Sequence, residues 1–357
     1  MNAPLALPGG YRARSCGRFL RYTRGMNAKI ICSFFAMLAT LSAWVPLGAA
    51  AVNLPGEDDA LVGESQTTVA RYQDTLSDIA RLHGLGFDEI RDANPGVDTW
   101  LPGEGTRVVL PTRHILPDAP RDGIVINVAE KRLYYYPPTR AGEQPRIVTY
   151  PVSIGRGDWQ TPLIATSILS KVKDPTWYPP ESVRKEHAAN GDPLPSAVPP
   201  GPNNPLGGFA MRLGLPSYLI HGTNKPFGIG MQVTHGCIRL YPEEIEALFN
   251  AVPVGTPVRI VNQTYKAGWH QGELYLEVHA PLSDGTDPAP AQNLTPVVAQ
   301  VIAATEGRPG YEIDWARVRA IVSEQAGVPI AVGRGEEPPA PPASVAQTET
   351  PDQSQAQ

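Results

Sequence analysis

The sequence predicts a mainly β protein with α+β additions, on three observations. The 357 residues include 39 prolines and 34 glycines, which indicate many turns and short strands and disfavour a helical bundle. In the longest block of the chain, apolar residues alternate with polar ones, which is typical of half-buried strands. Helical patterns are short, and most of them lie before or after this block.

The N-terminus, residues 1–51, has the features of a signal peptide. Six basic residues precede an apolar run over 30–47, and the small residues Gly48–Ala51 offer a cleavage site. We therefore expect export with cleavage near Ala49–Ala51. Two alternatives stay open at this point: the run could be an uncleaved membrane anchor, and translation could start at Met1 or at Met26.

The charge of the remaining chain excludes one class of partner. Residues 1–51 hold six of the 30 basic residues and none of the 35 acidic ones, so the rest carries a net charge of −11. Nucleic-acid binding depends on Lys and Arg that neutralise phosphates, so no nucleic-acid partner is expected. Residues 335–357 contain one branched aliphatic residue, Val345, and are expected to be disordered.

Residues 69–111 have the pattern of a small strand–helix–helix–strand unit. Asp74 or Thr75 can cap a first short helix, and a second is expected over 88–93. The run 108–111 closes the unit as a strand.

Residues 119–262 form the longest β-rich block. The alternation from Ile124 and the aromatic run at 133–136 predict a hairpin. Further elements are expected as strands over 146–154, 166–172, 218–220 and 258–261, and as a helix over 242–249. Residues 173–208 contain no clear element, and a loop of this length inside a domain is more often functional than decorative.

Residues 265–330 are expected to form an accessory α+β unit. An alternating strand covers 273–278, and helices are expected over 295–304 and from Asp314 to before Gly327. No chemical constellation is evident in this unit.

The candidate nucleophile is Cys237. It is the one cysteine left after the leader, because Cys16 and Cys32 fall within residues 1–51. The thiolate is the reactive form of cysteine, so the thiol needs a base or a positive neighbour. His221 and His235 are the two candidates for the base.

Three neighbours of the cysteine can support such chemistry. Gly236 permits a tight turn, after which the backbone N–H groups of Gly236 and Cys237 could stabilise an oxyanion. Thr234 adds a hydroxyl for local hydrogen bonding, and Arg239 could hold a substrate carboxylate.

Three other interpretations of these residues remain open from residue types alone. Cys237 could be a buried small hydrophobe. With His221 and His235 it could form a zinc site in a wall peptidase, although no carboxylate or third histidine stands at ligand spacing. Arg239 could pair with Glu243 or Glu244 on the following helix.

The complete motif resembles the signature of the L,D-transpeptidase (YkuD/ErfK/YbiS-type) family. In that family a histidine is followed later by Ser/Thr-His-Gly-Cys, which matches His221 and the run 234–237. The stretches 177–180 and 201–207 are similar to the cell-envelope subgroup, and the resemblance covers residue 69 to about 330. Many members have Asn where this chain has Arg239, a difference that bears on the choice of acceptor.

Residues 69–111 resemble a LysM module, through Asp-Thr-Leu at 74–76, Ala-Asn-Pro at 93–95 and the final Leu-Pro at 110–111. Gln73 stands where these modules usually carry glycine. The resemblance implies binding to N-acetylglucosamine-containing glycan; the alternative is a packing domain that has lost this activity.

The family resemblance implies a β-sandwich of mixed sheets with a loop-and-hairpin cap over the thiol. It also implies a periplasmic, wall-associated and monomeric enzyme without cofactor or metal.

The resemblance further implies a reaction. Cys237 would attack the bond between diaminopimelate and D-alanine in a tetrapeptide donor stem, forming a thioester. The acceptor could be a second diaminopimelate, which gives a 3→3 cross-link, a lysine of an outer-membrane lipoprotein, or water. His221 would be the base, oriented by the carbonyl of Gly222, and His235 would support the site. A non-catalytic peptidoglycan-binding protein is the alternative function.

Overall fold

The computed structural model describes residues 51–56, 59–282, 294–308 and 310–335. The expected signal peptide and C-terminal tail therefore lie outside the described residues, apart from one residue at each boundary. No helix in the described part is long and apolar enough to cross a membrane.

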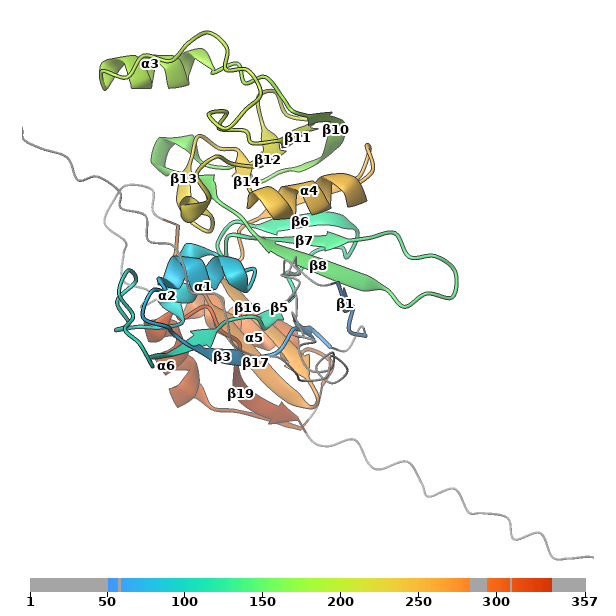
Figure 1. The fold of residues 1–357 in the computed structure, drawn as a ribbon. Helices are drawn as coiled ribbons and strands as arrows, with labels where there is room; N and C mark the ends of the chain where they lie inside the picture. The colour runs from blue at the N-terminus through green and yellow to red at the C-terminus, as the bar shows by residue number, and fades with distance from the viewer. Residues whose placement is uncertain (1–50, 57–58, 283–293, 309, 336–357) are drawn as a thin grey trace, which may run out of the picture. The chain divides into compact units, whose positions relative to one another are not determined.

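The largest element is a mixed sheet of nine strands, in the order β1-β8-β7-β6-β15-β10-β11-β12-β14 (Figure 1). The pairs β6–β15 and β12–β14 are parallel, and the other neighbours are antiparallel. In sheet order the strands are β1 (Val52–Asn53), β8 (Arg146–Pro151), β7 (Arg132–Tyr136), β6 (Gly123–Asn127), β15 (Pro257–Val261), β10 (Ala165–Lys173), β11 (Phe209–Leu213), β12 (Leu219–His221) and β14 (Ile238–Arg239).

Strand β10 joins the two halves of this sheet. Its first residues pair with β15 and its later ones with β11, with a register shift between Ile168 and Ser170. One hydrophobic core contains residues of both halves, such as Ile126 and Ile220, together with Ile245 of helix α4 (Pro242–Ala251). This architecture confirms the predicted fold class, a mainly β protein with mixed sheets.

The strand expected over 146–154 is interrupted, and the interruption helps to place the cysteine motif. After β8 the chain turns at Val152 and Ser153, and β9 (Ile154–Gly155) pairs in parallel with β13 (Gln232–Thr234) in a separate two-stranded sheet. The residues that follow β9 therefore lie beside the Thr-His-Gly-Cys run.

The segment 173–208, which was expected to be loop-rich, contains helix α3 (Glu181–Ala189). Only Val183 of this helix is buried, so the sequence offers no apolar stripe from which the helix could be recognised. An isolated bridge between Trp177 and Val198 closes the base of the segment. Two short 3-10 turns, η1 (Gly157–Trp159) and η2 (Pro226–Gly228), lie elsewhere in the catalytic block.

Residues 66–110 fold as strand, helix, helix and strand, in the expected order. The elements are β3 (Gln66–Val69), α1 (Leu76–Leu82), α2 (Phe87–Asp92) and β4 (Arg107–Leu110), with β3 and β4 antiparallel. Thr75 is the N-cap of α1, and it exchanges hydrogen bonds with Asp78 in a capping box. Strand β2 (Leu61–Val62) precedes this unit in the sequence and β5 (His114–Ile115) follows it. The two strands form an antiparallel pair.

This small unit is bound tightly to the catalytic block. Arg132 of β7 is buried and makes a bidentate ion pair with Glu89, with contacts of 3.0 and 2.7 Å. The backbone N–H of Phe87 donates to the carbonyl of Ile229 at 2.9 Å. A Cβ on Gly230 would lie 2.3 Å from the Cα of Gly86, so the two backbones meet where only glycines fit.

The C-terminal unit is a four-stranded sheet with two helices. Its strands, in sheet order, are β16 (Tyr265–His270), β17 (Glu273–Val278), β19 (Ile330–Gly335) and β18 (Tyr311–Ile313). Helices α5 (Thr295–Thr305) and α6 (Trp315–Glu324) supply Val301 and Val318 to its core. The unit extends to Gly335, beyond the expected limit at residue 330, because β19 pairs with both β17 and β18.

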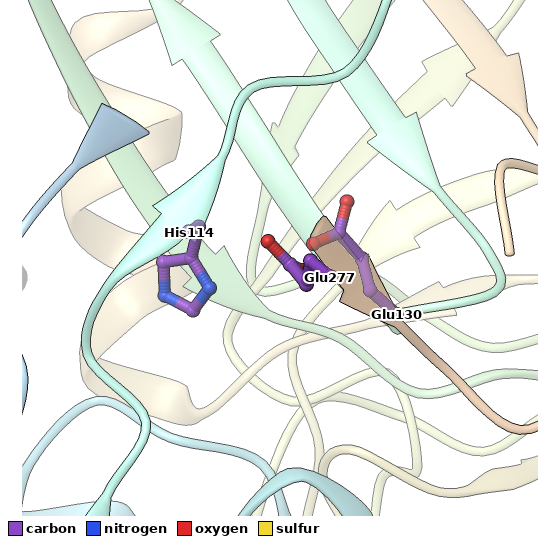
Figure 2. Close-up of side chains that lie close together, drawn as sticks. All are labelled: His114, Glu130 and Glu277. Carbon is purple, nitrogen blue, oxygen red and sulfur yellow. The ribbon is translucent and has the colours of Figure 1, made fainter. Parts of the chain in front are cut away.

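A buried ionic cluster connects this unit to the rest of the chain (Figure 2). The ammonium of Lys266 lies 2.7 Å from Glu130 and 2.8 Å from Glu277, and it donates to the carbonyl of Ile115 at 2.6 Å. Burial opposes the charge of Lys266, but the two carboxylates raise its pKa above the ordinary value. The cation therefore stays charged between groups from three parts of the chain.

We predict that Lys266→Met destabilises the fold severely, because it removes the ammonium that the buried carboxylates of Glu130 and Glu277 share. Breaking one partner of a buried ion pair typically costs about 3–5 kcal/mol, measured here as the free energy of urea unfolding. The control is Arg334→Met, which removes an exposed ion pair to Glu273 and should cost about 1 kcal/mol or less. Equal losses in the two variants would contradict a stabilising role for the buried cluster.

Candidate active site

The run from Thr234 to Cys237 forms a tight turn closed by its own side chain. The hydroxyl of Thr234 is buried and donates to the carbonyl of Cys237 at 2.6 Å. Gly236 has a φ of +96°, and a Cβ there would lie 2.7 Å from the ring of Tyr218. The glycine is thus required both by its backbone conformation and by its neighbour.

Cys237 is partly exposed and free. Its thiol lies 3.5 Å from the carbonyl of Ser217, to which it donates. Burial raises the pKa of the thiol, while the backbone of Leu219 and the charge of Arg239 act in the opposite direction. The resting nucleophile is therefore a protonated thiol and not a preformed thiolate.

His221 ends β12, which runs parallel to β14, so that His221 is paired with Arg239. The imidazole is 3% exposed, and its Nδ1 lies 2.7 Å from the carbonyl oxygen of Gly222. A carbonyl can only accept, so Nδ1 carries the hydrogen and Nε2 keeps its lone pair. Burial, followed by the charge of Arg239, lowers the pKa of His221 to about 3. The ring is neutral at physiological pH and can accept a proton at Nε2.

Arg239 lies near both groups. Its guanidinium is largely buried, and burial lowers its pKa, while its Nε has no hydrogen-bond partner among the described residues. Glu243 pairs with Arg81 of the small unit and not with Arg239. The structure shows no ion pair between Arg239 and either Glu243 or Glu244 at the start of α4. It therefore does not support that interpretation of Arg239. The charge of Arg239 acts instead on His221 and Cys237, and it acts to lower the pKa of both groups.

His235 lies in a cluster that the sequence did not indicate. Its Nε2 is 2.6 Å from a carboxylate oxygen of Glu186 on α3, and the same carboxylate pairs with Arg156. The ring of Trp159 packs against the imidazole at 5.2 Å, nearly edge to face. Glu186 and Arg156 are 49 and 79 residues from His235, which is why no local pattern shows the cluster.

Asn204 is a second residue that sequence reasoning missed, within the stretch 201–207. Its buried side chain donates to the carbonyl of Pro175 at 2.7 Å and accepts from the backbone N–H of Leu206 at 2.9 Å. The backbone of Leu206 in turn hydrogen-bonds His221. Asn204 thus fastens the base of segment 174–208 next to the imidazole.

The zinc interpretation finds no support in the geometry. Among the described residues, His221, His235 and Cys237 do not bring their ligand atoms together; the one such group is His114, Glu130 and Glu277. Figure 2 shows these three side chains. The ammonium of Lys266 contacts both carboxylates. A cation is already supplied there by the chain itself.

Comparisons with known proteins agree with this geometry. Residues 121–260 match the family model of the L,D-transpeptidase catalytic domain, YkuD. The chain is 38% identical over 317 residues to the probable L,D-transpeptidase ErfK/SrfK of Escherichia coli K12, covering 87% of this chain and 98% of that protein. It is 37% identical to the probable L,D-transpeptidase YbiS of the same strain, over 85% of this chain and 99% of the other.

Among solved structures, L,D-transpeptidase 3 of Mycobacterium tuberculosis is 21% identical, with a TM-score of 0.29 over 43% of this chain and 66% of that one. The sequence relatives show the family, because they align with this chain over nearly their whole length. The chain therefore belongs to the L,D-transpeptidase family of enzymes.

Proposed function

We propose that the protein is a cysteine-dependent L,D-transpeptidase that acts on peptidoglycan stem peptides. Cys237 would cleave the bond between diaminopimelate and D-alanine through a thioester and pass the acyl group to an amine. The observation that carries this proposal is the buried, neutral His221, whose Nδ1 is held by the carbonyl of Gly222 and whose strand pairs with β14, directly after the Thr-His-Gly-Cys turn.

The resting protonation states indicate how the thiol is activated. Because the pKa of Cys237 is raised and that of His221 lowered, the proton moves only as sulfur attacks the scissile carbonyl. The N–H groups of Gly236 and Cys237, with Arg239 nearby, would stabilise the oxyanion. His221 then returns the proton to the nitrogen of D-alanine, which leaves as a free amino acid.

The acceptor completes the reaction. An amine attacks the thioester, gives its proton to His221 and releases the thiol. A second diaminopimelate would give a 3→3 cross-link, a lysine of an outer-membrane lipoprotein would give a protein anchor, and water would give a trimmed stem. Mass spectrometry of wall fragments from a deletion strain assigns the acceptor by the linkage that disappears.

Glycan binding by residues 69–111, as in a LysM module, is a further part of the proposal. Two loops of this unit meet where the N–H of Leu76 donates to the carbonyl of Thr99 at 2.9 Å. Tyr72 and Trp100 project from these loops with 81% and 58% exposure. Exposed aromatic rings suit the apolar faces of sugars, since such rings bury large areas on contact.

The first prediction from this function concerns pH. Neither group of the pair titrates near neutrality, so the rate of D-alanine release by the parent should be flat from about pH 5 to 8. His221→Ala should lower the rate by about 10²–10⁴-fold at pH 7 and regain part of it at higher pH, as the thiol ionises unaided. Cys237→Ala is the control that should release none while unfolding at the parent temperature.

An inflection between pH 6 and 7 in the parent that disappears in His221→Ala would show that His221 titrates near its ordinary value, against this mechanism. EDTA should leave the rate unchanged, because a thiol beside a histidine needs no metal. Loss of activity with chelator and recovery with zinc would favour the metallopeptidase.

A second prediction tests the glycan contact. Trp100→Ala should reduce co-sedimentation with purified peptidoglycan sacculi, while the release of D-alanine from a soluble tetrapeptide should change little. Trp315→Ala, which alters a partly exposed tryptophan of the C-terminal unit, is the matched control and should sediment like the parent. Equal pelleting of all three proteins would refute the tether.

Export to the periplasm is the remaining part of the proposal. Intact-mass measurement of the protein recovered from the cell envelope should show cleavage near Ala49–Ala51. Recovery of peptides from residues 1–48 in membrane fractions would favour the anchor instead.

A further inference from the structure

The carboxylate of Glu186 occupies a site built from two nitrogen donors, one of them on His235, two residues before Cys237. One oxygen lies 2.6 Å from Nε2 of His235, and the other pairs with the guanidinium of Arg156. The guanidinium of Arg156 and the imidazole N–H of His235 together form a two-pronged donor site, here called the fork, of the kind that binds carboxylates.

The donor half of this site is fixed with respect to the nucleophile. Arg156 follows β9 directly, and its backbone N–H donates to the carbonyl of Thr234 at 3.0 Å. The hydroxyl of Thr161 accepts from the N–H of Gly155 and donates to the carbonyl of Gly236 at 3.0 Å. Since Gly236 lies between His235 and Cys237, these bonds set the distance from the fork to the thiol.

The carboxylate half is held loosely. Glu186 belongs to α3, of which one side chain, Val183, is buried. The other ion pairs of α3 join residues of the segment 174–208 to each other. Among the described residues, Glu186 is the residue of α3 whose side chain forms hydrogen bonds and ion pairs outside this segment. Its side chain is 31% exposed, and ion pairs open to solvent contribute about 1 kcal/mol or less. Another carboxylate can therefore displace it at small cost.

The fork also has unused capacity. The Nε of Arg156 is buried and has no hydrogen-bond partner within the described part of the chain, although a guanidinium offers five N–H donors in a fixed geometry. A ligand that reached this nitrogen would satisfy a donor that Glu186 leaves unpaired, which favours exchange.

We propose that Arg156 and His235 form a carboxylate-binding subsite beside Cys237, which Glu186 fills until a carboxylate of the donor peptide displaces it. The identity of the peptide rests on the proposed function, in which the leaving D-alanine carries a free carboxylate one residue beyond the scissile bond. Glu186 is then a built-in competitor, and Arg156 selects donors with an anionic end. In a chain with a net charge of −11 after residue 51, such a local cation is needed to bind an anionic peptide.

The first experiment uses probes that do not depend on the natural substrate. Cys237 in the full chain is alkylated with iodoacetate or with iodoacetamide, and its modification is followed by peptide mass spectrometry. Glu186→Gln should raise the ratio of the iodoacetate rate to the iodoacetamide rate by up to about fivefold, and Arg156→Gln should lower it below the parent value. Glu181→Gln on the same helix, which removes the exposed pair with Lys185, is the matched control and should keep the parent ratio.

The second experiment compares a tetrapeptide that has a free terminal carboxylate with its C-terminal amide. Glu186→Gln should lower KM for the free acid and leave the amide unchanged, whereas Arg156→Gln should raise KM for the free acid alone. If Glu186→Gln instead lowers kcat equally for both peptides and leaves the alkylation ratio at the parent value, Glu186 clamps α3 and the subsite is refuted. If the parent releases no D-alanine but the alkylation ratios shift as expected, the subsite stands and the proposed substrate is wrong.

Discussion

The parallel pairing of β12 with β14 is the interaction on which the site depends. It covers two residue pairs, Ile220 with Ile238 and His221 with Arg239, yet it brings His221, the last residue of β12, and Cys237, the residue before β14, to one edge of the sheet. A pairing this short has few hydrogen bonds of its own, so neighbouring elements must hold it. Helix α4 packs Ile245 into the same core as both strands, and the backbone of Leu240 donates to the carbonyl of His221 at 2.9 Å.

The small N-terminal unit contributes to this support. The segment between His221 and Thr234 passes through Ile229 and Gly230, and the start of α2 holds it by a backbone hydrogen bond and by a glycine–glycine approach. Behind that contact, Glu89 satisfies the buried guanidinium of Arg132. Removing the whole unit would leave that charge buried and unpaired. The unit is therefore part of the scaffold of the active site as well as a candidate tether, and point substitutions on its exposed loops test glycan binding more cleanly than a deletion.

The sequence allowed prediction of those parts of the site that are local in the chain. Thr234, His235, Gly236 and Cys237 are consecutive, and strand periodicity placed His221 at a strand end, so their proximity could be inferred. Arg156 and Glu186 could not be inferred, because each is far from His235 in sequence and neither stands in a distinctive pattern. Helix α3 was missed because a nearly all-exposed helix has no apolar periodicity. The break between β8 and β9 was missed because Val152 continues the alternation of the strand while the backbone leaves the sheet.

The protonation states of the pair bear on how Cys237 would survive in the exported protein that we propose. Thiolates are oxidised far more readily than thiols, and no second cysteine of the described chain can protect Cys237 in a disulfide. Burial raises the pKa of its thiol, and the neutral, buried His221 does not draw the proton away at rest. The nucleophile is then exposed to oxidants mainly as the unreactive thiol. In the proposed mechanism, proton transfer becomes favourable only when an electrophilic carbonyl is in place, because the developing oxyanion supplies the negative charge that stabilises imidazolium beside Arg239. The same burial that makes the resting site slow to oxidise thus makes its reactivity depend on bound substrate.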